Sequence, residues 1–272
     1  MLGRLMKYEF LATGRQIIPA YMGVVLFAVL NRILIEIGGG ADQIWDGAGA
    51  AWAGVASGLL IFFYALGVCT VGILTFVLII RRFYINLFKD EGYLTNTLPV
   101  SVDTHIWGKL IPAACWSVAS GLVIFVSLWI MLGGLLREFT LWQDVIRPTI
   151  QIEPLFAALW LLSGIVGLLA ATLAFYSALS IGQLAKRRKI LLAIGAYFGM
   201  SFAFSIVTSF FSVIYFESFG GGAPALIGLG ILGATANDEA VFIVTAMGLS
   251  LLQGAIHYVI TRQILKNKLN LE

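Results

Sequence analysis

Residues 154–184 read PLFAALWLLSGIVGLLAATLAFYSALSIGQL, and no charged side chain interrupts them. A helix needs about 20 apolar residues to cross roughly 30 Å of hydrocarbon, so this stretch is long enough to span a bilayer. Residues 186–189, which follow almost directly, are all Lys or Arg. An apolar block that ends in a basic cluster is typical of a transmembrane helix with its end in the cytoplasm.

The composition of the whole chain agrees with a lipid environment. Of its 272 residues, 60% are hydrophobic and only 11% are charged, whereas soluble domains have roughly 25% charged residues. So few charges cannot cover a water-soluble surface. The formal net charge is +3, but the basic residues form short clusters between apolar blocks and no continuous stripe, which argues against nucleic-acid binding.

Six apolar blocks are long enough to cross a membrane. They lie at residues 17–37, 52–80, 110–136, 154–184, 190–216 and 240–261. We therefore predict an all-α, polytopic membrane protein, with a transmembrane domain over residues 17–272 that contains six transmembrane helices.

The basic residues predict the orientation of these six spans, because cytoplasmic loops are enriched in Lys and Arg. Of the 17 basic residues, all but Arg32, Arg137 and Arg147 fall on one side. That side contains Arg4, Lys7, Arg15, Arg81, Arg82, Lys89, Lys109, Lys186, Arg187, Arg188, Lys189, Arg262, Lys266 and Lys268. Both termini are therefore predicted to be cytoplasmic.

Two further segments have alternative interpretations. In residues 1–16, apolar side chains recur at helical spacing among basic ones, which predicts an amphipathic helix on the cytoplasmic membrane surface; a basic leader that serves only topology is the alternative. Residues 218–237 also lack charge, but they contain six glycines between Gly220 and Gly233, and Pro224. A seventh span would place the basic C-terminus outside, so we expect a re-entrant hairpin between spans five and six, or a glycine-rich outer loop.

No set of residues typical of an enzyme occurs in the sequence. His105 and His257 lie far apart, and no His-Glu-x-x-His run is present. No lysine precedes Ser or Thr, so the chain lacks the Walker A pattern for ATP phosphates. The middles of the spans contain almost no ionisable residues, which disfavours transport driven by protons or sodium ions. We predict a protein that is not an enzyme and binds no cofactor or metal by itself.

The longest predicted cytoplasmic loop, residues 81–109, has an informative centre, KDEGYLTNTLPVS over residues 89–101. Two acids suit the positive N-terminal end of a short helix, and a proline ends it. Between them lies a partly apolar face formed by Tyr93, Leu94, Thr97 and Leu98. Such a helix has a shape that docks into a groove of a partner; a solvated connector that packs on its own membrane domain is the alternative.

The opening MLGRLMKYEF (residues 1–10), together with DEGYL (90–94) running into TLPVS (97–101), resembles the type-two permease family, the membrane subunits of bacterial ATP-binding-cassette exporters. The resemblance covers the whole chain in layout and these two stretches in sequence. It implies a surface helix before six spans, a coupling helix between spans two and three that docks on the ATPase, and a re-entrant element between spans five and six.

The resemblance also implies a function and partners. The ATPase-docking residues would be Asp90, Glu91, Tyr93, Leu94, Thr97, Leu98 and Pro99. The partners would be cytoplasmic P-loop ATPase subunits, which bind ATP and Mg, and a second permease chain, identical or homologous. We expect a subunit in the bacterial cytoplasmic membrane that exports an amphiphile such as a peptide, drug or lipid. A membrane scaffold or regulatory protein without transport activity, or a lone secondary transporter, remains an alternative.

Overall fold

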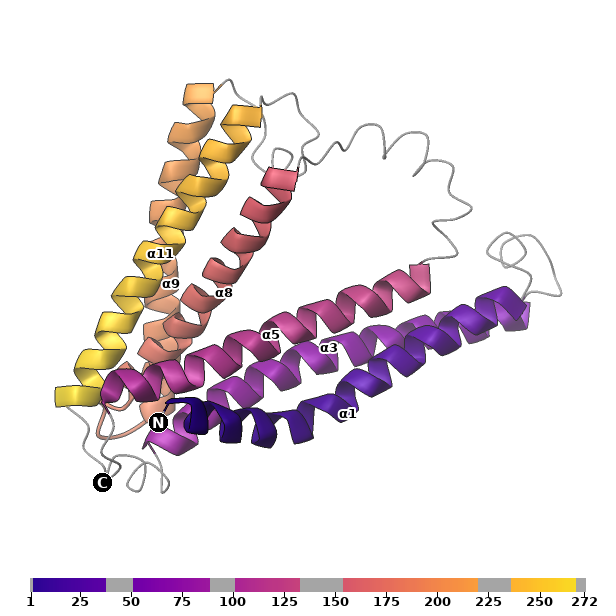
Figure 1. Ribbon diagram of the computed structural model, residues 1–272, viewed down its shortest axis with the longest axis horizontal. Helices are drawn as coiled ribbons and strands as arrows, with labels where there is room; N and C mark the ends of the chain where they lie inside the picture. The colour runs from indigo at the N-terminus through magenta and orange to yellow at the C-terminus, as the bar shows by residue number, and fades with distance from the viewer. Residues whose placement is uncertain (1, 38–50, 89–100, 133–153, 220–235, 268–272) are drawn as a thin grey trace. The chain divides into compact units, whose positions relative to one another are not determined.

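The computed structural model describes residues 2–37, 51–88, 101–132, 154–219 and 236–267. Within these ranges the chain forms six long α-helices (Figure 1). They are α1 (Leu2–Ile37), α3 (Ala51–Phe88), α5 (Val102–Leu132), α8 (Pro154–Gly182), α9 (Lys189–Phe219) and α11 (Ala236–Asn267). Each contains a segment long and apolar enough to cross a membrane, which confirms the prediction of an all-α, multi-pass membrane protein.

Several helices extend past the apolar blocks that predicted them. Helix α3 continues through Arg81 and Arg82 to Phe88, and α5 begins at Val102, before the apolar block that starts at Leu110. Charged residues end an apolar block but do not end a helix, because the polar zone of a bilayer extends beyond the hydrocarbon and solvates them. The ends of α3 and α5 therefore continue helically toward the loop between them.

The N-terminal segment forms one helix with the first span. Helix α1 is continuous from Leu2 to Ile37, with Pro19 inside it, and its membrane-compatible part covers Leu5–Ile33. The predicted surface helix at 1–16 is thus the first part of α1, and its position on the membrane surface stays a prediction. Of the predicted re-entrant segment, the described residues include only the end of α9 and the start of α11; residues 220–235 lie outside them.

One of two compact units contains residues 4–79 and 115–148. Its core is formed by Val24 and Ala28 of α1 with Tyr64 and Val71 of α3. Polar side chains also join its helices: Tyr64 OH lies 2.8 Å from Ser127 Oγ on α5. Such hydrogen bonds help to hold helices together in lipid, where apolar contact alone gives little preference for protein over lipid.

A second polar cluster in this unit joins three helices. Ser120 Oγ on α5 lies 2.7 Å from Tyr21 OH on α1 and 2.8 Å from Thr75 Oγ1 on α3. The Asn31 amide of α1 donates to the backbone oxygen of Leu60 on α3 at 3.2 Å. These contacts fix the register of α1 against its neighbours, because a hydroxyl or amide in lipid that loses its partner has no water to replace it.

The other unit contains residues 1–3, 80–114 and 149–272, and we call it the C-terminal bundle. Helices α8, α9 and α11 run beside one another in it, with α8 packed against both others (Figure 1). Gly254 of α11 lies so close to α8 that an added Cβ would be 3.6 Å from Ala170. A glycine at this contact lets two helix backbones approach closely, as is common in membrane bundles.

The turn between α8 and α9 is tightly built. A Cβ added to Gly182 would lie 2.7 Å from both the Lys189 backbone oxygen and the Ala193 Cβ, so only glycine fits there. Arg188, the residue before α9, has a positive φ of 58°. A non-glycine residue in this left-handed conformation marks a chain reversal that the surrounding contacts maintain.

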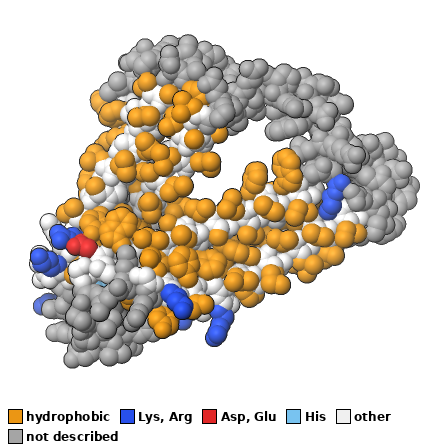
Figure 2. All heavy atoms as spheres, viewed as in Figure 1, with side chains coloured by type: hydrophobic (Ala, Val, Ile, Leu, Met, Phe, Trp, Pro, Cys, Tyr) orange, Lys and Arg blue, Asp and Glu red, His pale blue; other side chains and the backbone are white. Residues whose placement is uncertain are grey.

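Large apolar side chains cover the flanks of the helices. On α9, Phe198, Phe202 and Phe210 are 66%, 69% and 67% exposed. Figure 2 shows hydrophobic side chains along most of the length of the helices, with Lys and Arg in only a few places. An apolar surface of this extent is unfavourable in water, so lipid or other apolar partners surround it.

Candidate functional site

The seven predicted ATPase-docking residues, from Asp90 to Pro99, lie outside the described residues. The structure does describe both ends of the segment that contains them. Helix α3 leads into it at Phe88, and α5 begins just after it at Val102. The candidate site therefore consists of the contacts that hold these two helix ends in place. We call these contacts the loop anchors.

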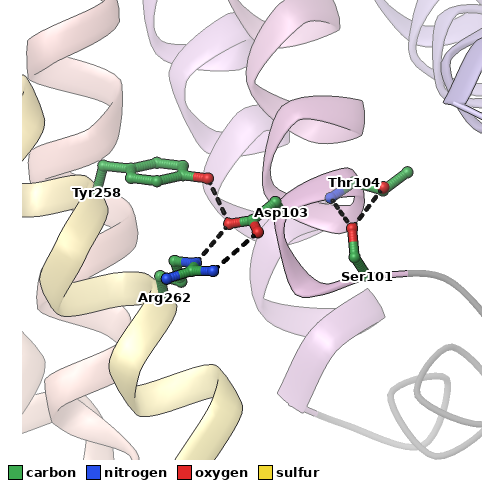
Figure 3. Close-up of polar contacts among 5 residues, drawn as sticks. All are labelled: Ser101, Asp103, Thr104, Tyr258 and Arg262. Atoms are coloured by element: carbon green, nitrogen blue, oxygen red, sulfur yellow. Dashed lines mark hydrogen bonds and ion pairs between the residues drawn. The ribbon is translucent and has the colours of Figure 1, made fainter.

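The first anchor starts at the N-terminus of α5. Ser101 Oγ accepts a hydrogen bond from the Thr104 backbone N–H at 3.3 Å and lies 2.8 Å from Thr104 Oγ1 (Figure 3). A serine in this position satisfies a backbone N–H that has no partner within the helix. Asp103 lies in the first helical turn, where the positive end of the helix dipole favours a carboxylate. The sequence therefore ends the loop and starts the helix at a defined residue.

Asp103 connects α5 to α11 through both of its carboxylate oxygens. Oδ1 accepts hydrogen bonds from Tyr258 OH at 2.5 Å and from Arg262 Nε at 2.7 Å, and Oδ2 accepts one from an Arg262 terminal nitrogen at 3.2 Å (Figure 3). Tyr258 and Arg262 are four residues apart, so they lie on the same face of α11. The two-pronged contact fixes the orientation of the guanidinium relative to the carboxylate.

The exposure of this ion pair limits its strength. The Arg262 side chain is 48% exposed and that of Asp103 is 38% exposed, and water and salt screen such pairs. Its role is therefore mainly geometric. One helical turn after Asp103 on α5, the centroid of the Trp107 ring lies 6.0 Å from the centroid of the Tyr258 ring. This adds an aromatic contact between the same two helices.

The second anchor lies near the end of α3. The Phe83 ring stacks on the Tyr176 ring of α8 with centroids 3.7 Å apart and planes within 6° of parallel. Phe83 is 0% and Tyr176 is 1% exposed, and Leu87, one turn further along α3, is 1% exposed. This end of α3 is therefore buried in the C-terminal bundle, and a shift of the α3 end would have to carry α8 with it or break the stack.

The partners of the two anchors are themselves joined. His257 Nδ1 of α11 lies 2.8 Å from Ser177 Oγ of α8, and both side chains are buried. Ser177 and Tyr176 are neighbours in sequence, and His257 precedes Tyr258. His257 thus makes a hydrogen bond between α11 and α8. Both ends of the loop are held by a single pair of packed helices, α8 and α11.

The loop anchors provide mechanical connections between helices. Among the residues that the structure describes, no three His, Cys, Asp or Glu side chains come together in a way that could hold a metal ion. What the anchors can do is transmit displacement, because a stacked ring pair and a two-pronged ion pair resist both sliding and rotation. A force on residues 89–100 would reach α8 through Phe83 and α11 through Asp103.

Sequence reasoning missed both anchors. A signal for the first was present, because Asp103 and Arg262 have opposite charges at the same predicted membrane boundary. For the second anchor there was no such signal, because Phe83 and Tyr176 are two of many aromatic residues in the sequence. No known protein family, curated protein or solved structure matches this chain.

Proposed function

We propose that this chain is the membrane-spanning permease subunit of an ATP-binding-cassette exporter. In this proposal a separate P-loop ATPase hydrolyses ATP, and two permease chains, identical or homologous, enclose the transport pathway. The exported substrate is an amphiphile such as a peptide, a drug or a lipid. The bacterial cytoplasmic membrane is the expected location.

The observation that carries the proposal is the attachment of residues 89–100 at both ends. Phe83 before the loop stacks on α8, and Asp103 after it binds α11. A loop that only connected two spans would not need to be tied to two other helices. A loop that receives force from a partner does need this, because the force must reach helices that line a pathway.

These contacts support a mechanism in which the loop transmits movement to the spans. When the ATPase subunits close on ATP, the loop between α3 and α5 moves with them, and the anchors carry α8 and α11 in the same direction. Rocking of these helices exposes the pathway to alternate sides of the membrane. Since a ligand shifts a conformational equilibrium only by its differential affinity for the two states, ATP binding supplies the energy for uphill export.

The test uses the predicted docking face. Leu94→Asp places a charge in the apolar face of the loop, so we expect the ATPase to dissociate and ATP-dependent export to stop while the chain still inserts. Leu98→Asp should act in the same way. Asn96→Asp is the matched control, because it adds the same charge outside the predicted contact set and should leave both properties intact.

The measurements are co-purification of the ATPase with the tagged chain, followed by substrate-stimulated ATP hydrolysis in the reconstituted complex. Unchanged export by Leu94→Asp and Leu98→Asp would reject the docking assignment. A bound ATPase that no substrate stimulates would indicate a scaffold. Transport that needs an ion gradient and no ATPase would indicate a secondary carrier.

A further inference from the structure

A groove lies between α9 and α11 in the C-terminal bundle. It encloses a cavity of about 250 Å³. Thr208 and Ser212 of α9 face it from one side, and Thr245, Ser250 and Gln253 of α11 face it from the other. Ser212 lies seven residues from the end of α9 at Phe219, which corresponds to about 10 Å along the helix. On α11 the groove extends from Phe242 to Gln253, which lies five residues before Tyr258 of the first loop anchor.

The hydroxyl groups of the groove present oxygen lone pairs rather than donors. Each donates its proton to a backbone oxygen of its own helix: Ser212 to Thr208 at 2.9 Å, Thr245 to Val241 at 2.7 Å and Ser250 to Ala246 at 2.9 Å. Thr208 donates to the backbone oxygens of residues 204 and 205. A hydroxyl has one proton and two lone pairs, so these four oxygens can still accept hydrogen bonds.

This arrangement selects the polarity of a ligand. A ligand that donates hydrogen bonds can meet the hydroxyl oxygens without disturbing either helix. A ligand that accepts them could use the amide N–H groups of Gln253, but to use a hydroxyl it would first have to break an intrahelical bond in a medium where no water replaces that bond. Among the described residues that line the groove, none is a Lys or Arg that could attract an anion. It therefore favours ligands that carry N–H groups over carboxylates and phosphates.

Two aromatic rings complete the groove, Phe211 of α9 and Phe242 of α11. The face of an aromatic ring attracts a cation. The lining that the structure describes includes no acidic side chain, so a bound ammonium would be held there by oxygen lone pairs and aromatic rings and not by an ion pair. Release of the ligand is therefore easier than from an ion pair, because no full opposite charge has to be separated when the ligand leaves.

The size of the cavity limits the ligand further. Pockets that enclose drug-sized ligands measure roughly 300–1,000 Å³, so a cavity of about 250 Å³ fits a head group and not a whole drug-sized molecule. The flank of α9 beside it is apolar, with Phe210 67% and Val213 56% exposed. An alkyl chain attached to the head group would find a compatible surface there.

From these observations we propose that the groove between α9 and α11 binds the amine head group of an amphiphile that enters from the bilayer, with its N–H groups on the hydroxyl oxygens and its alkyl chain along α9. Binding as such does not depend on the proposed function. That the bound amine is exported does rest on it.

The experiment measures binding of three dansyl-labelled alkyl probes to the full chain in nanodiscs that lack phosphatidylethanolamine. The probes share one chain and end in a primary ammonium, a trimethylammonium or a carboxylate. We expect the primary ammonium to bind roughly tenfold more tightly than the trimethylammonium, because only the former donates hydrogen bonds, and the carboxylate to bind no more than to empty nanodiscs.

Variants locate the site. Thr245→Val removes one acceptor oxygen at nearly constant shape and should weaken binding of the primary ammonium roughly tenfold, whereas Thr245→Ser should retain it. Thr70→Val is the matched control, since Thr70 on α3 makes the same backbone hydrogen bond of 2.7 Å outside the groove. It should bind as the unmodified chain does.

Equal binding of all three probes, or equal binding by Thr245→Val and Thr70→Val, would overturn the assignment. Loss of the primary ammonium's advantage in nanodiscs that contain phosphatidylethanolamine would support it, because that lipid is itself an amphiphile with a primary ammonium head group and would compete for the groove. The assay contains no ATPase, so its failure would leave the proposed function standing. Loss of the ATPase from the purified chain would leave the binding site standing.

Discussion

The stack of Phe83 on Tyr176 allows a quantitative test of the second loop anchor. Phe83→Ala removes a ring that is 0% exposed and stacked at 3.7 Å. In soluble proteins such a change costs about 3–5 kcal/mol. The unfolded state of a membrane protein stays in detergent or lipid, so the free energy of transferring the ring out of water contributes little to this cost. The remaining cost comes mainly from the lost contacts of the ring and from the cavity that it leaves. We expect a decrease of about 2 kcal/mol in the free energy of unfolding.

The assay is reversible unfolding in mixed dodecyl maltoside and SDS micelles, followed by circular dichroism. Phe62→Ala is the matched control, because Phe62 lies on the same helix but is 58% exposed, and its removal should change stability by less than about 0.5 kcal/mol. A double-mutant cycle with Phe83→Leu and Tyr176→Leu should give a coupling energy of about 1 kcal/mol. Equal effects of Phe83→Ala and Phe62→Ala, or a coupling energy near zero, would refute the stack as an anchor.

Three further predictions concern charge, packing and topology. Asp103→Asn removes the charge that faces Arg262, so thermal stability should fall slightly and depend less on salt than in the unmodified chain; an unchanged salt dependence would contradict the ion pair. Gly182→Ala places a Cβ 2.7 Å from atoms at the start of α9 and should cost about 1–3 kcal/mol in the same micelles, whereas Gly195→Ala, with nothing within 4 Å, should be neutral or stabilise by up to about 1 kcal/mol. Arg187→Cys in a cysteine-free background should react with an impermeant maleimide in inverted vesicles, and reaction in intact cells would overturn the predicted orientation.

Much of the fold follows from the sequence. The uncharged run at 154–184 predicts α8 almost to its ends, because Pro154 begins the helix and Gly182 ends it. The block at 52–80 predicts α3 but not its continuation to Phe88, since hydropathy detects the hydrocarbon boundary and not the end of the backbone hydrogen bonding. The same reason explains why α5 begins before the block at 110–136.

The candidate site is less accessible from sequence. Residues 90–99 can be selected as a candidate site from the sequence, because they combine an apolar face and a helix-ending proline within a polar loop. Their docking role stays a prediction. The anchors on either side involve partners far away in the chain. Asp103 and Arg262 are separated by 159 positions, and no periodicity within a single helix relates them.

What the sequence determined by itself was the solvent, the number of spans and the predicted sidedness, because each depends on local quantities: the length of an apolar run and the charges beside it. Only the tertiary structure decided which side chains meet, as with Phe83 and Tyr176 or Ser177 and His257. In lipid, apolar helix faces have nearly equal affinity for one another and for acyl chains. The choice of neighbour therefore depends on close packing and on hydrogen bonds between particular side chains, which appear only when whole helices are placed together.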